Sequence, residues 1–140
     1  MVELNKPYKF DDGTATFIKL DVMLVKFNTD KRVSLKDVTN IRNLRQELIG
    51  TQPYYPIIDC RDGFINFTSE AKAWAAVNKE STAVRQMDVL LVNNLASKIE
   101  AQIYLKIFKP LVKTKITTSI DKALALIEKE KIVRKEKVSI

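Results

Sequence analysis

The densest group of reactive side chains comprises Asp59, Cys60, Arg61 and Asp62, at the end of a predicted apolar strand over residues 55–60. A cysteine nucleophile needs a base that forms its thiolate, and the chain contains no histidine. This absence excludes Cys–His pairs, Ser–His–Asp triads and most zinc sites. An aspartate–arginine pair that fixes the loop is the simpler interpretation of this cluster.

Two carboxylates could take the place of histidine as a general base. Asp59 and Asp88 each lie in a predicted strand, and each could instead pair with Arg61. The sequence lacks a glycine-rich phosphate loop, the GxGxxG pattern and paired metal-binding carboxylates. We therefore predict no catalytic residue, no metal and no cofactor, and we rank a hydrolase or transferase below any binding function.

Two hydroxyl side chains, Thr68 and Ser69, stand at the predicted start of a helix over residues 69–78. A hydroxyl at this place accepts a hydrogen bond from a backbone N–H group of the first turn and so caps the helix. A phosphate there would meet the free N–H groups and the positive end of the helix dipole. We expect a cap, with a phosphorylation switch as the alternative.

The loop before this helix is unusually apolar, because it contains Phe64, Ile65 and Phe67. These side chains could fold into the core beside Trp74. Alternatively, they form an exposed patch for a partner protein, a second copy of the chain or a lipid tail.

A second helix start contains Asn93, Asn94 and Ser97, after the apolar residues 89–92. Asparagine caps helices well, and the free N–H groups of a first turn could hold an anion. In a mainly parallel sheet this start lies at the same edge as the loop that carries Arg61. A small apolar or anionic ligand, lipid-like or a nucleotide, could bind between the two.

Positive charge is concentrated near the C-terminus. The net charge is +7, and residues 109–140 contribute +5 of it, with nine Lys and Arg against four Asp and Glu. Glutamates interrupt the basic residues, and no aromatic side chain lies among them for base stacking. We expect a solvated surface and no nucleic-acid partner, and we expect residues 131–140 to be either a frayed helix end or a basic, mobile tail.

The order of apolar segments predicts alternating strands and helices. Strands are expected over residues 14–19, 22–27, 55–60, 85–92 and 112–117, with a short edge segment at 6–9, and helices over 34–49, 69–78, 94–108 and 118–130. Such alternation implies parallel strands joined by right-handed crossovers. The predicted fold class is α/β: a mixed, mainly parallel sheet of about five strands, with an antiparallel edge hairpin and about four helices.

Helical spacing assigns an apolar face to three of these helices. The faces comprise Leu35, Val38, Ile41, Leu44 and Leu48; Leu95, Ile99, Ile103 and Ile107; and Ile120, Ala123, Leu124 and Ile127. Arg42 and Arg45 fall on the polar side of the first helix, where we expect solvated charge. Ser34 with Asp37, and Gly50, are the expected start and stop of that helix.

Length and composition fit one globular domain over residues 1–130. The single cysteine excludes an intrachain disulfide and favours a reducing compartment. No apolar run approaches the ~20 residues that a membrane span needs, and the first residues lack the layout of a signal peptide. We expect a cytoplasmic protein without a membrane span.

Four segments carry a resemblance to a known superfamily: residues 55–61, 69–71, 89–93 with Ser97, and 104–110. Within residues 14–129 the chain resembles the SpoIIAA-like superfamily, which includes STAS domains, and in particular small stand-alone bacterial STAS-like proteins of unassigned function. Regulatory STAS proteins carry Asp-Ser-Ser-Gly before their second helix, where phosphorylation of a serine breaks partner binding. This chain has Phe67-Thr68-Ser69-Glu70 there, which keeps the hydroxyls without the aspartate and glycine.

The resemblance implies a non-enzymatic interaction or regulatory module that acts through protein contact, centred on residues 61–71. It also implies self-association as a homodimer, because STAS-like domains often pair. The alternative is the binding of a small apolar or anionic ligand. The candidate partner or ligand contacts are Arg61, Asp62, Phe64, Phe67, Asn93, Asn94 and Ser97.

Overall fold

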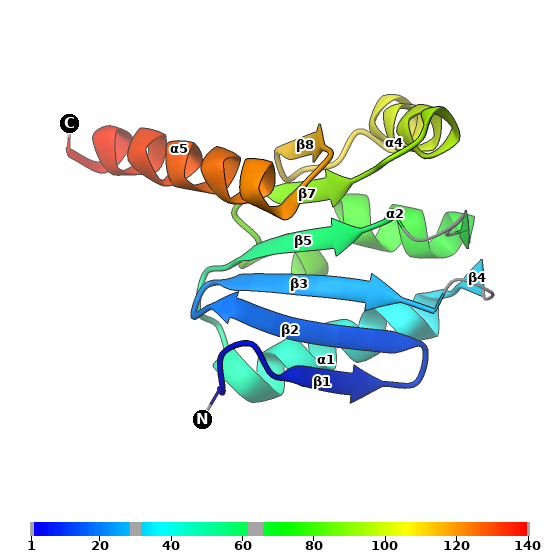
Figure 1. Cartoon of the computed structure of the whole chain (residues 1–140), viewed down its shortest axis with the longest axis horizontal. Helices are drawn as coiled ribbons and strands as arrows, with labels where there is room; N and C mark the ends of the chain where they lie inside the picture. The colour runs from blue at the N-terminus through cyan, green and yellow to red at the C-terminus, as the bar shows by residue number, and fades with distance from the viewer. Residues whose placement is uncertain (1, 29–31, 62–65, 140) are drawn as a thin grey trace.

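The computed structural model describes residues 2–28, 32–61 and 66–139. Six strands form one mixed sheet in the order β1-β2-β3-β5-β7-β8 (Figure 1). They are β1 Pro7–Phe10, β2 Gly13–Lys19, β3 Val22–Phe27, β5 Tyr55–Asp59, β7 Asp88–Leu91 and β8 Thr114–Thr117. β2 is antiparallel to both of its neighbours, and β3, β5, β7 and β8 are mutually parallel. The predicted α/β class, with its antiparallel edge hairpin, is confirmed.

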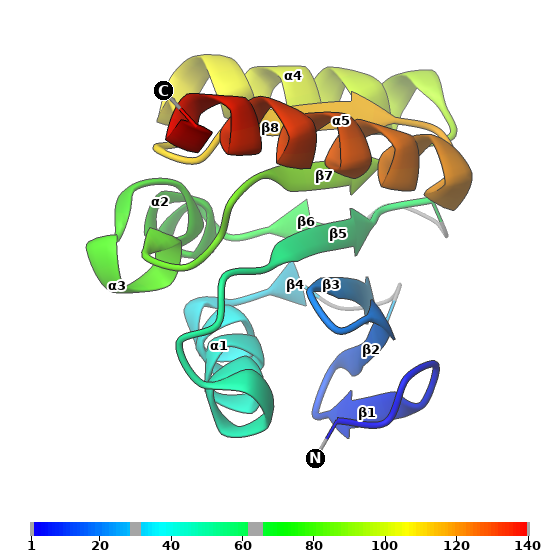
Figure 2. The same cartoon turned by 90° about the vertical axis from the view of Figure 1, so that its left-hand side faces the viewer.

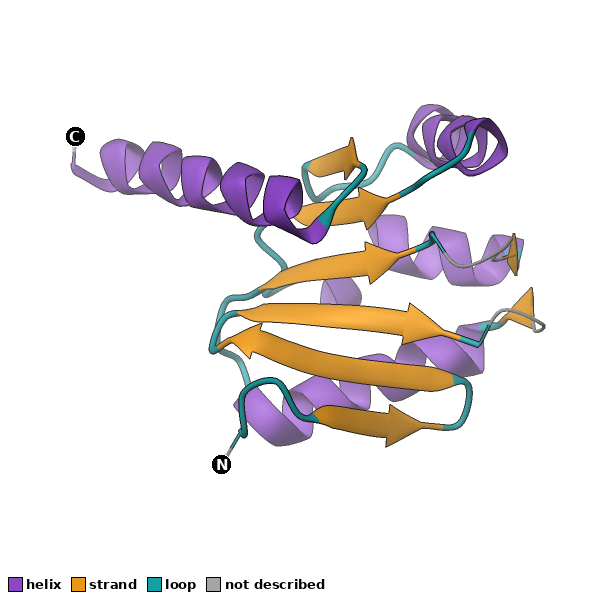
Figure 3. Ribbon diagram, viewed as in Figure 1, coloured by secondary structure: helices purple, strands orange, loops and turns teal. Residues whose placement is uncertain are grey.

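Helices cover both faces of this sheet (Figures 1 and 3). They are α1 Leu35–Ile49, α2 Ser69–Val77, the short α3 Lys79–Thr82, α4 Leu95–Phe108 and α5 Ile120–Ser139. Because β3, β5, β7 and β8 follow one another across the sheet, right-handed crossovers place α1, α2 and α4 on one face. α5 follows the last strand and returns over the other face (Figure 2). Among the described residues, no helix is long and apolar enough to cross a membrane.

Local signals in the sequence set the bounds of α1 as predicted. Ser34 and Asp37 form a capping box, in which each side chain accepts a hydrogen bond from the backbone N–H of the other. Gly50 ends the helix at a φ of 61°, a conformation that costs glycine little because it has no Cβ atom. Both the start and the stop of this helix are therefore confirmed.

Two apolar cores lie on opposite faces of the sheet. Ile57 of β5 belongs to the core under α5, with the buried Ala123 and Ile127. The next residue, Ile58, packs on the other face against the core that includes Met23 and the apolar side of α1. Successive side chains of a strand point to opposite faces, so the prediction that this strand is covered on both sides is confirmed.

The predicted apolar face of α4 is not part of either core. Leu95, Ile99, Ile103 and Ile107, which we call the outer α4 stripe, are 44–72% exposed. The helix instead contacts the domain through a side that includes the buried Ser97 and Ala101, with Tyr104 and Phe108 stacked at 5.7 Å between ring centroids. Spacing identifies an apolar stripe but not its direction, and this helix is apolar on two sides.

Arg45 differs from expectation, and the last helix extends into the basic segment after residue 130. Arg45, predicted as solvated, is buried, donates to the carbonyl of Gly50 and lies over the Tyr54 ring at 5.4 Å. α5 continues through Ser139, beyond the expected boundary at residue 130. Lys131 forms an ion pair of 2.8 Å with Asp21, which ties this part of the helix to the β2–β3 turn.

Two short features have no counterpart in the predicted elements. β4 Arg32–Val33 and β6 Asn66–Phe67 form a separate parallel pair. They directly precede α1 and α2, so they hold the starts of these two helices side by side. The backbone N–H of Thr68 also donates to the carbonyl of Val33, at 2.9 Å.

The packing of α5 is tested by two substitutions of the same kind. Ile127 is 0% exposed under the sheet, whereas Ile132 on the same helix is 60% exposed. Removing a buried aliphatic side chain leaves a cavity, so Ile127→Ala should lower the free energy of unfolding by about 2–5 kcal/mol. Ile132→Ala should change it by no more than about 0.5 kcal/mol. Equal effects in urea unfolding would contradict this placement of α5.

Candidate functional site

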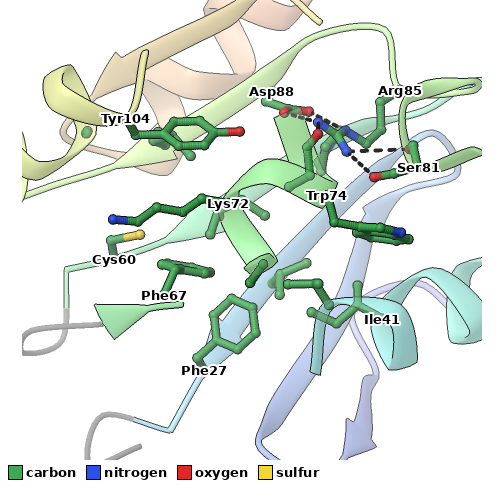
Figure 4. Close-up of a pocket in the computed structure, with 18 of the residues that line it drawn as sticks. Phe27, Ile41, Cys60, Phe67, Lys72, Trp74, Ser81, Arg85, Asp88 and Tyr104 are labelled. Carbon is green, nitrogen blue, oxygen red and sulfur yellow. Dashed lines mark hydrogen bonds and ion pairs between the residues drawn. The ribbon is translucent and has the colours of Figure 1, made fainter. Parts of the chain in front are cut away.

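A cavity of about 170 Å³ lies between the sheet and helices α1, α2 and α4. Its floor is formed by side chains of β3, β5 and β7, among them Val25, Ile58 and Leu90. Its walls include Ile41 of α1, Trp74 of α2 and several residues of α4. Figure 4 shows Trp74, Phe27 and Phe67 around this space. The lining is largely apolar and aromatic.

The cavity exists because small side chains line the helices that cover it. Ala71 and Ala75 on α2, and Ser97 and Ala101 on α4, all contribute to its walls. Protein interiors are normally packed with few voids, and larger side chains at these positions would reach toward the sheet. The spacings of four residues place each pair on one side of its helix.

One end of the cavity lies at the carboxyl edge of the parallel strands. Cys60 follows β5, Phe67 ends β6, and Lys72 belongs to the first turns of α2. The Phe67 ring meets Phe27 edge to face, with centroids 5.4 Å apart. Lys72 Nζ lies 3.8 Å from Glu100 of α4. This end therefore combines aromatic surface with one balanced ion pair.

The other end is closed by a buried ion pair, Arg85 with Asp88. Arg85 donates to both carboxylate oxygens, at 2.9 and 2.7 Å, and both side chains are about nine-tenths buried. The guanidinium also donates to Ser81 Oγ at 2.8 Å and to the carbonyl of Ala75 at 2.7 Å (Figure 4). Burial raises the pKa of Asp88, and the charge and hydrogen bonds of Arg85 oppose that rise.

Three further titratable groups of the lining are neutral at pH 7. Removal from water raises the pKa of the Cys60 thiol to about 12, and the nearby Asp59 charge adds to the rise. Burial likewise raises the pKa of Tyr54 and of Tyr104 to about 12. With the charged side chains paired and these groups protonated, the cavity presents a surface without net charge to a ligand.

The reactive cluster at the end of β5 forms the aspartate–arginine pair that the sequence suggested. Asp59 is buried and accepts hydrogen bonds from Arg61 Nε and Nη2, each at 3.0 Å. The backbone N–H of Arg61 donates to the same carboxylate at 3.1 Å. Asp88 pairs with Arg85 and not with Arg61. Two other predicted contacts, Asp62 and Phe64, lie outside the described residues.

The predicted helix starts are present. Thr68 caps α2 by accepting a hydrogen bond from Ala71 N at 3.1 Å, and Ser69 is the exposed first residue of the helix. Asn94 caps α4 by accepting from Ser97 N at 2.8 Å, and its amide donates to Asn93 at 3.1 Å. Each cap thus engages one of the first-turn N–H groups that the sequence left available for an anion.

Of the predicted contact residues, Phe67 and Ser97 line the cavity, whereas Arg61, Asn93 and Asn94 do not. Sequence reasoning missed the remaining functional groups of the lining. These are Arg42, Tyr54, Lys72, Trp74, Ser81, Arg85, Glu100 and Tyr104. The one available signal was the group of alanines around the single tryptophan in α2.

The described residues contain no group of three or more His, Cys, Asp or Glu side chains placed to hold a metal. Of the carboxylates in and beside the cavity, Asp59 and Asp88 are each engaged by an arginine, and Glu100 lies 3.8 Å from Lys72. What remains is aromatic and aliphatic surface, with hydrogen-bonding groups at the two ends.

Comparison with known proteins identifies a family without an assigned activity. A family model described as Domain of unknown function (DUF7793) matches residues 16–131, most of the chain. Neither the curated proteins nor the solved structures compared with the chain gave a match. The resemblance to SpoIIAA-like and STAS domains stays a prediction.

The raised pKa of Cys60 predicts slow alkylation of the folded protein. A thiolate is the reactive form of cysteine, and at about pH 8 very little of it should form in the cavity. We expect iodoacetamide to modify the folded chain at least about 100-fold more slowly than the urea-unfolded chain. Mass spectrometry measures this directly, since the chain has one cysteine. Similar rates in both states would contradict the neutral thiol.

Asp59 should make the free energy of unfolding depend on pH in the acid range. Burial disfavours its charged form, but hydrogen bonds from Arg61 and the charges of Arg61 and Lys26 lower the pKa of Asp59 below its usual value. A carboxyl group of this kind stabilises the fold above its unfolded pKa, and that stabilisation is lost as the pH falls through the folded pKa. Asp59→Asn should therefore lower the free energy of unfolding by about 1–3 kcal/mol near neutral pH.

The difference between Asp59→Asn and the wild type should begin to shrink as the pH falls below about 4, the usual pKa of an unfolded aspartate, and should be lost as the pH falls through the lower folded pKa, where the wild-type carboxyl is protonated. Urea unfolding at a series of pH values measures it. Asp11→Asn, in the exposed β1–β2 turn, is the control and should change little. A difference for Asp59→Asn that does not vary with pH would show that its charge does not stabilise the fold.

Proposed function

The chain belongs to the DUF7793 family, a domain of unknown function, and we propose that it is a non-enzymatic binding protein for a small, largely apolar ligand. The observation that carries this proposal is the cavity between the sheet and α1, α2 and α4, with its aromatic lining and neutral titratable groups. Concave, mainly apolar sites with a few polar groups are the usual form of small-molecule sites.

The size of the cavity limits the ligand. An apolar cavity of roughly 150 Å³ is large enough for a benzene-sized molecule, and this one has about 170 Å³. One aromatic ring or a short alkyl chain therefore fits. Trp74, Phe27 and Phe67 offer faces and edges for an aromatic ring, which prefers offset or edge-to-face contacts.

Two ends of the cavity offer different polar partners. Lys72 at the carboxyl edge is 3.8 Å from Glu100, a distance longer than a hydrogen bond, so its ammonium group retains donor capacity for an anionic substituent. At the other end, Ser81 offers a hydroxyl group, and the Arg85–Asp88 ion pair has no net charge. The geometry thus supports a ligand with an apolar body and at most one carboxylate-like group at the Lys72 end.

The lining supports a non-enzymatic role. A nucleophilic Cys60 would need a lowered pKa, yet its pKa is raised to about 12. Asp59 and Asp88, the two candidate bases, each accept two hydrogen bonds from an arginine side chain. Neither carboxylate is left to take a proton from a bound molecule.

The protein-contact prediction centred on residues 61–71 draws less support from the described residues. Phe67 packs on Phe27 and lines the cavity, and Arg61 is held by Asp59. These side chains already make contacts within the domain, so they offer little free surface to a partner. We therefore place ligand binding first.

The ligand proposal is tested by filling the cavity. Toluene, benzoate and hexanoate serve as probes, and fluorescence of Trp74, the single tryptophan, reports their binding. We expect at least one probe to give a saturable change with a dissociation constant of about 1 mM or below. Ala75→Leu should weaken that binding at least about tenfold, because the added side chain occupies the cavity.

Ala125→Leu is the matched control, since it makes the same change at an exposed position of α5, on the other face of the sheet. It should leave probe binding unchanged. If Ala75→Leu does not fold, Ala101→Leu fills the same cavity from α4. The proposal fails if none of the three probes gives a saturable change, or if Ala125→Leu weakens binding as much as the cavity variant does.

A further inference from the structure

The outer α4 stripe is a continuous apolar surface that the described chain leaves uncovered. Leu95, Ile99, Ile103 and Ile107 are spaced four residues apart and are 44–72% exposed. The stripe covers about 18 Å at the 1.5 Å rise of a helix. Just beyond the helix end, Leu111 is exposed as well. Single exposed leucines are common, but an aligned row of them marks an interaction surface.

Three lysines lie beside the stripe. Lys98 lies three residues after Leu95, and Lys106 lies three residues after Ile103, so each lysine neighbours a stripe residue on the helix surface. Lys109 follows at the end of the helix. None of the ion pairs among the described residues uses these three lysines. Their ammonium groups are left to water or to an anionic partner.

The one carboxylate of α4 does not neutralise this face. Glu100 is turned toward α2, where Lys72 is its partner at 3.8 Å. A second copy of the chain would bring the same lysines against one another, and each copy carries a net charge of +7. Repulsion between like charges therefore disfavours self-association through this stripe.

Residue types separate the two anionic partners that remain, an acidic protein and a lipid surface. Protein interfaces are enriched in aromatic residues and arginine and depleted in lysine. Apart from Glu100, which pairs with Lys72, the stripe and its flanks contain only leucine, isoleucine, lysine and Gln102 as large side chains. This combination is typical of helices that lie flat in a membrane interface, with aliphatic side chains inserted and lysines at the anionic headgroups.

We propose that the outer face of α4 binds the surface of an anionic lipid bilayer. The helix is pre-organised for this contact, because Ser97, Ala101 and Tyr104 on its other side fix it to the domain. Figures 1 and 2 show α4 at the β8 end of the sheet, at the periphery of the molecule, where it can lie on a flat surface. The contact is peripheral and reversible, since four aliphatic side chains insert.

The test is flotation of the full chain with lipid vesicles. One set contains phosphatidylcholine alone, and the other contains roughly one-third phosphatidylglycerol. The chain should float with the anionic vesicles only, and raising the salt concentration to about 0.5 M should release it. Ile99→Asp with Ile103→Asp should reduce binding to the level of the neutral vesicles. Because both positions are exposed, these variants should keep the wild-type circular dichroism and melting temperature.

Two matched controls separate binding through this surface from a general effect of net charge or of an exposed apolar side chain. Lys98→Gln with Lys106→Gln should weaken binding at least about tenfold, whereas Lys9→Gln with Lys79→Gln, which removes the same charge elsewhere, should have a much smaller effect. Leu20→Asp, at an exposed position in the β2–β3 turn, should leave binding intact.

Three results would overturn the proposal. The first is no binding to the anionic vesicles. The second is an equal loss of vesicle binding in the two double lysine variants, which would show attraction by net charge alone. The third is a concentration-dependent dimer in sedimentation that disappears in Ile99→Asp with Ile103→Asp, which would make the stripe a protein interface. The result does not depend on the ligand proposal, because the cavity lies on the other side of α4.

Discussion

The Arg85–Asp88 ion pair is the interaction on which the side of the sheet covered by α1, α2 and α4 depends. Withdrawing two charges from water costs several kcal/mol each, and their attraction offsets this only with good geometry and further hydrogen bonds. Here Arg85 meets both oxygens of Asp88 and also donates to Ser81 and to the carbonyl of Ala75. One guanidinium thus joins the start of β7 to α3 and to the last turns of α2.

The position of α2 follows from this pair and from its own alanines. Arg85 fixes the helix near its C-terminal end, and Thr68 with the β4–β6 pair fixes its start. Between these points Ala71 and Ala75 face the sheet and do not fill the space beneath them. Beside the same space, the Tyr54 ring lies under Arg45, and the Tyr54 backbone forms a β-bridge with Arg85. The cavity is therefore a consequence of a helix that is fixed at both ends and carries small side chains in the middle.

Local signals in the sequence were enough for most of the fold and for little of the site. The capping box of Ser34 and the adjacent Ile57 and Ile58 involve neighbours in the chain or one strand, so pattern reasoning identifies them. The cavity depends on residues from α1, α2, α4 and three strands, and no spacing rule brings those together. Arg45 illustrates the difference. Its position on the helix suggested exposure to solvent, but Tyr54, which lies outside the helix and directly before β5, covers it.

The two sides of α4 account for the largest error and connect the two proposals. Small residues and Tyr104 make one side a wall of the cavity, whereas the outer α4 stripe leaves the other side apolar and exposed. A ligand in the cavity would contact Ser97 or Tyr104 of α4, the same helix whose outer stripe is proposed to lie on a bilayer. If occupancy of the cavity shifts α4, the affinities for ligand and for lipid must change each other by the same factor, because linkage between two binding sites is reciprocal. A rigid helix fixed by its small side chains is the element through which that coupling would act.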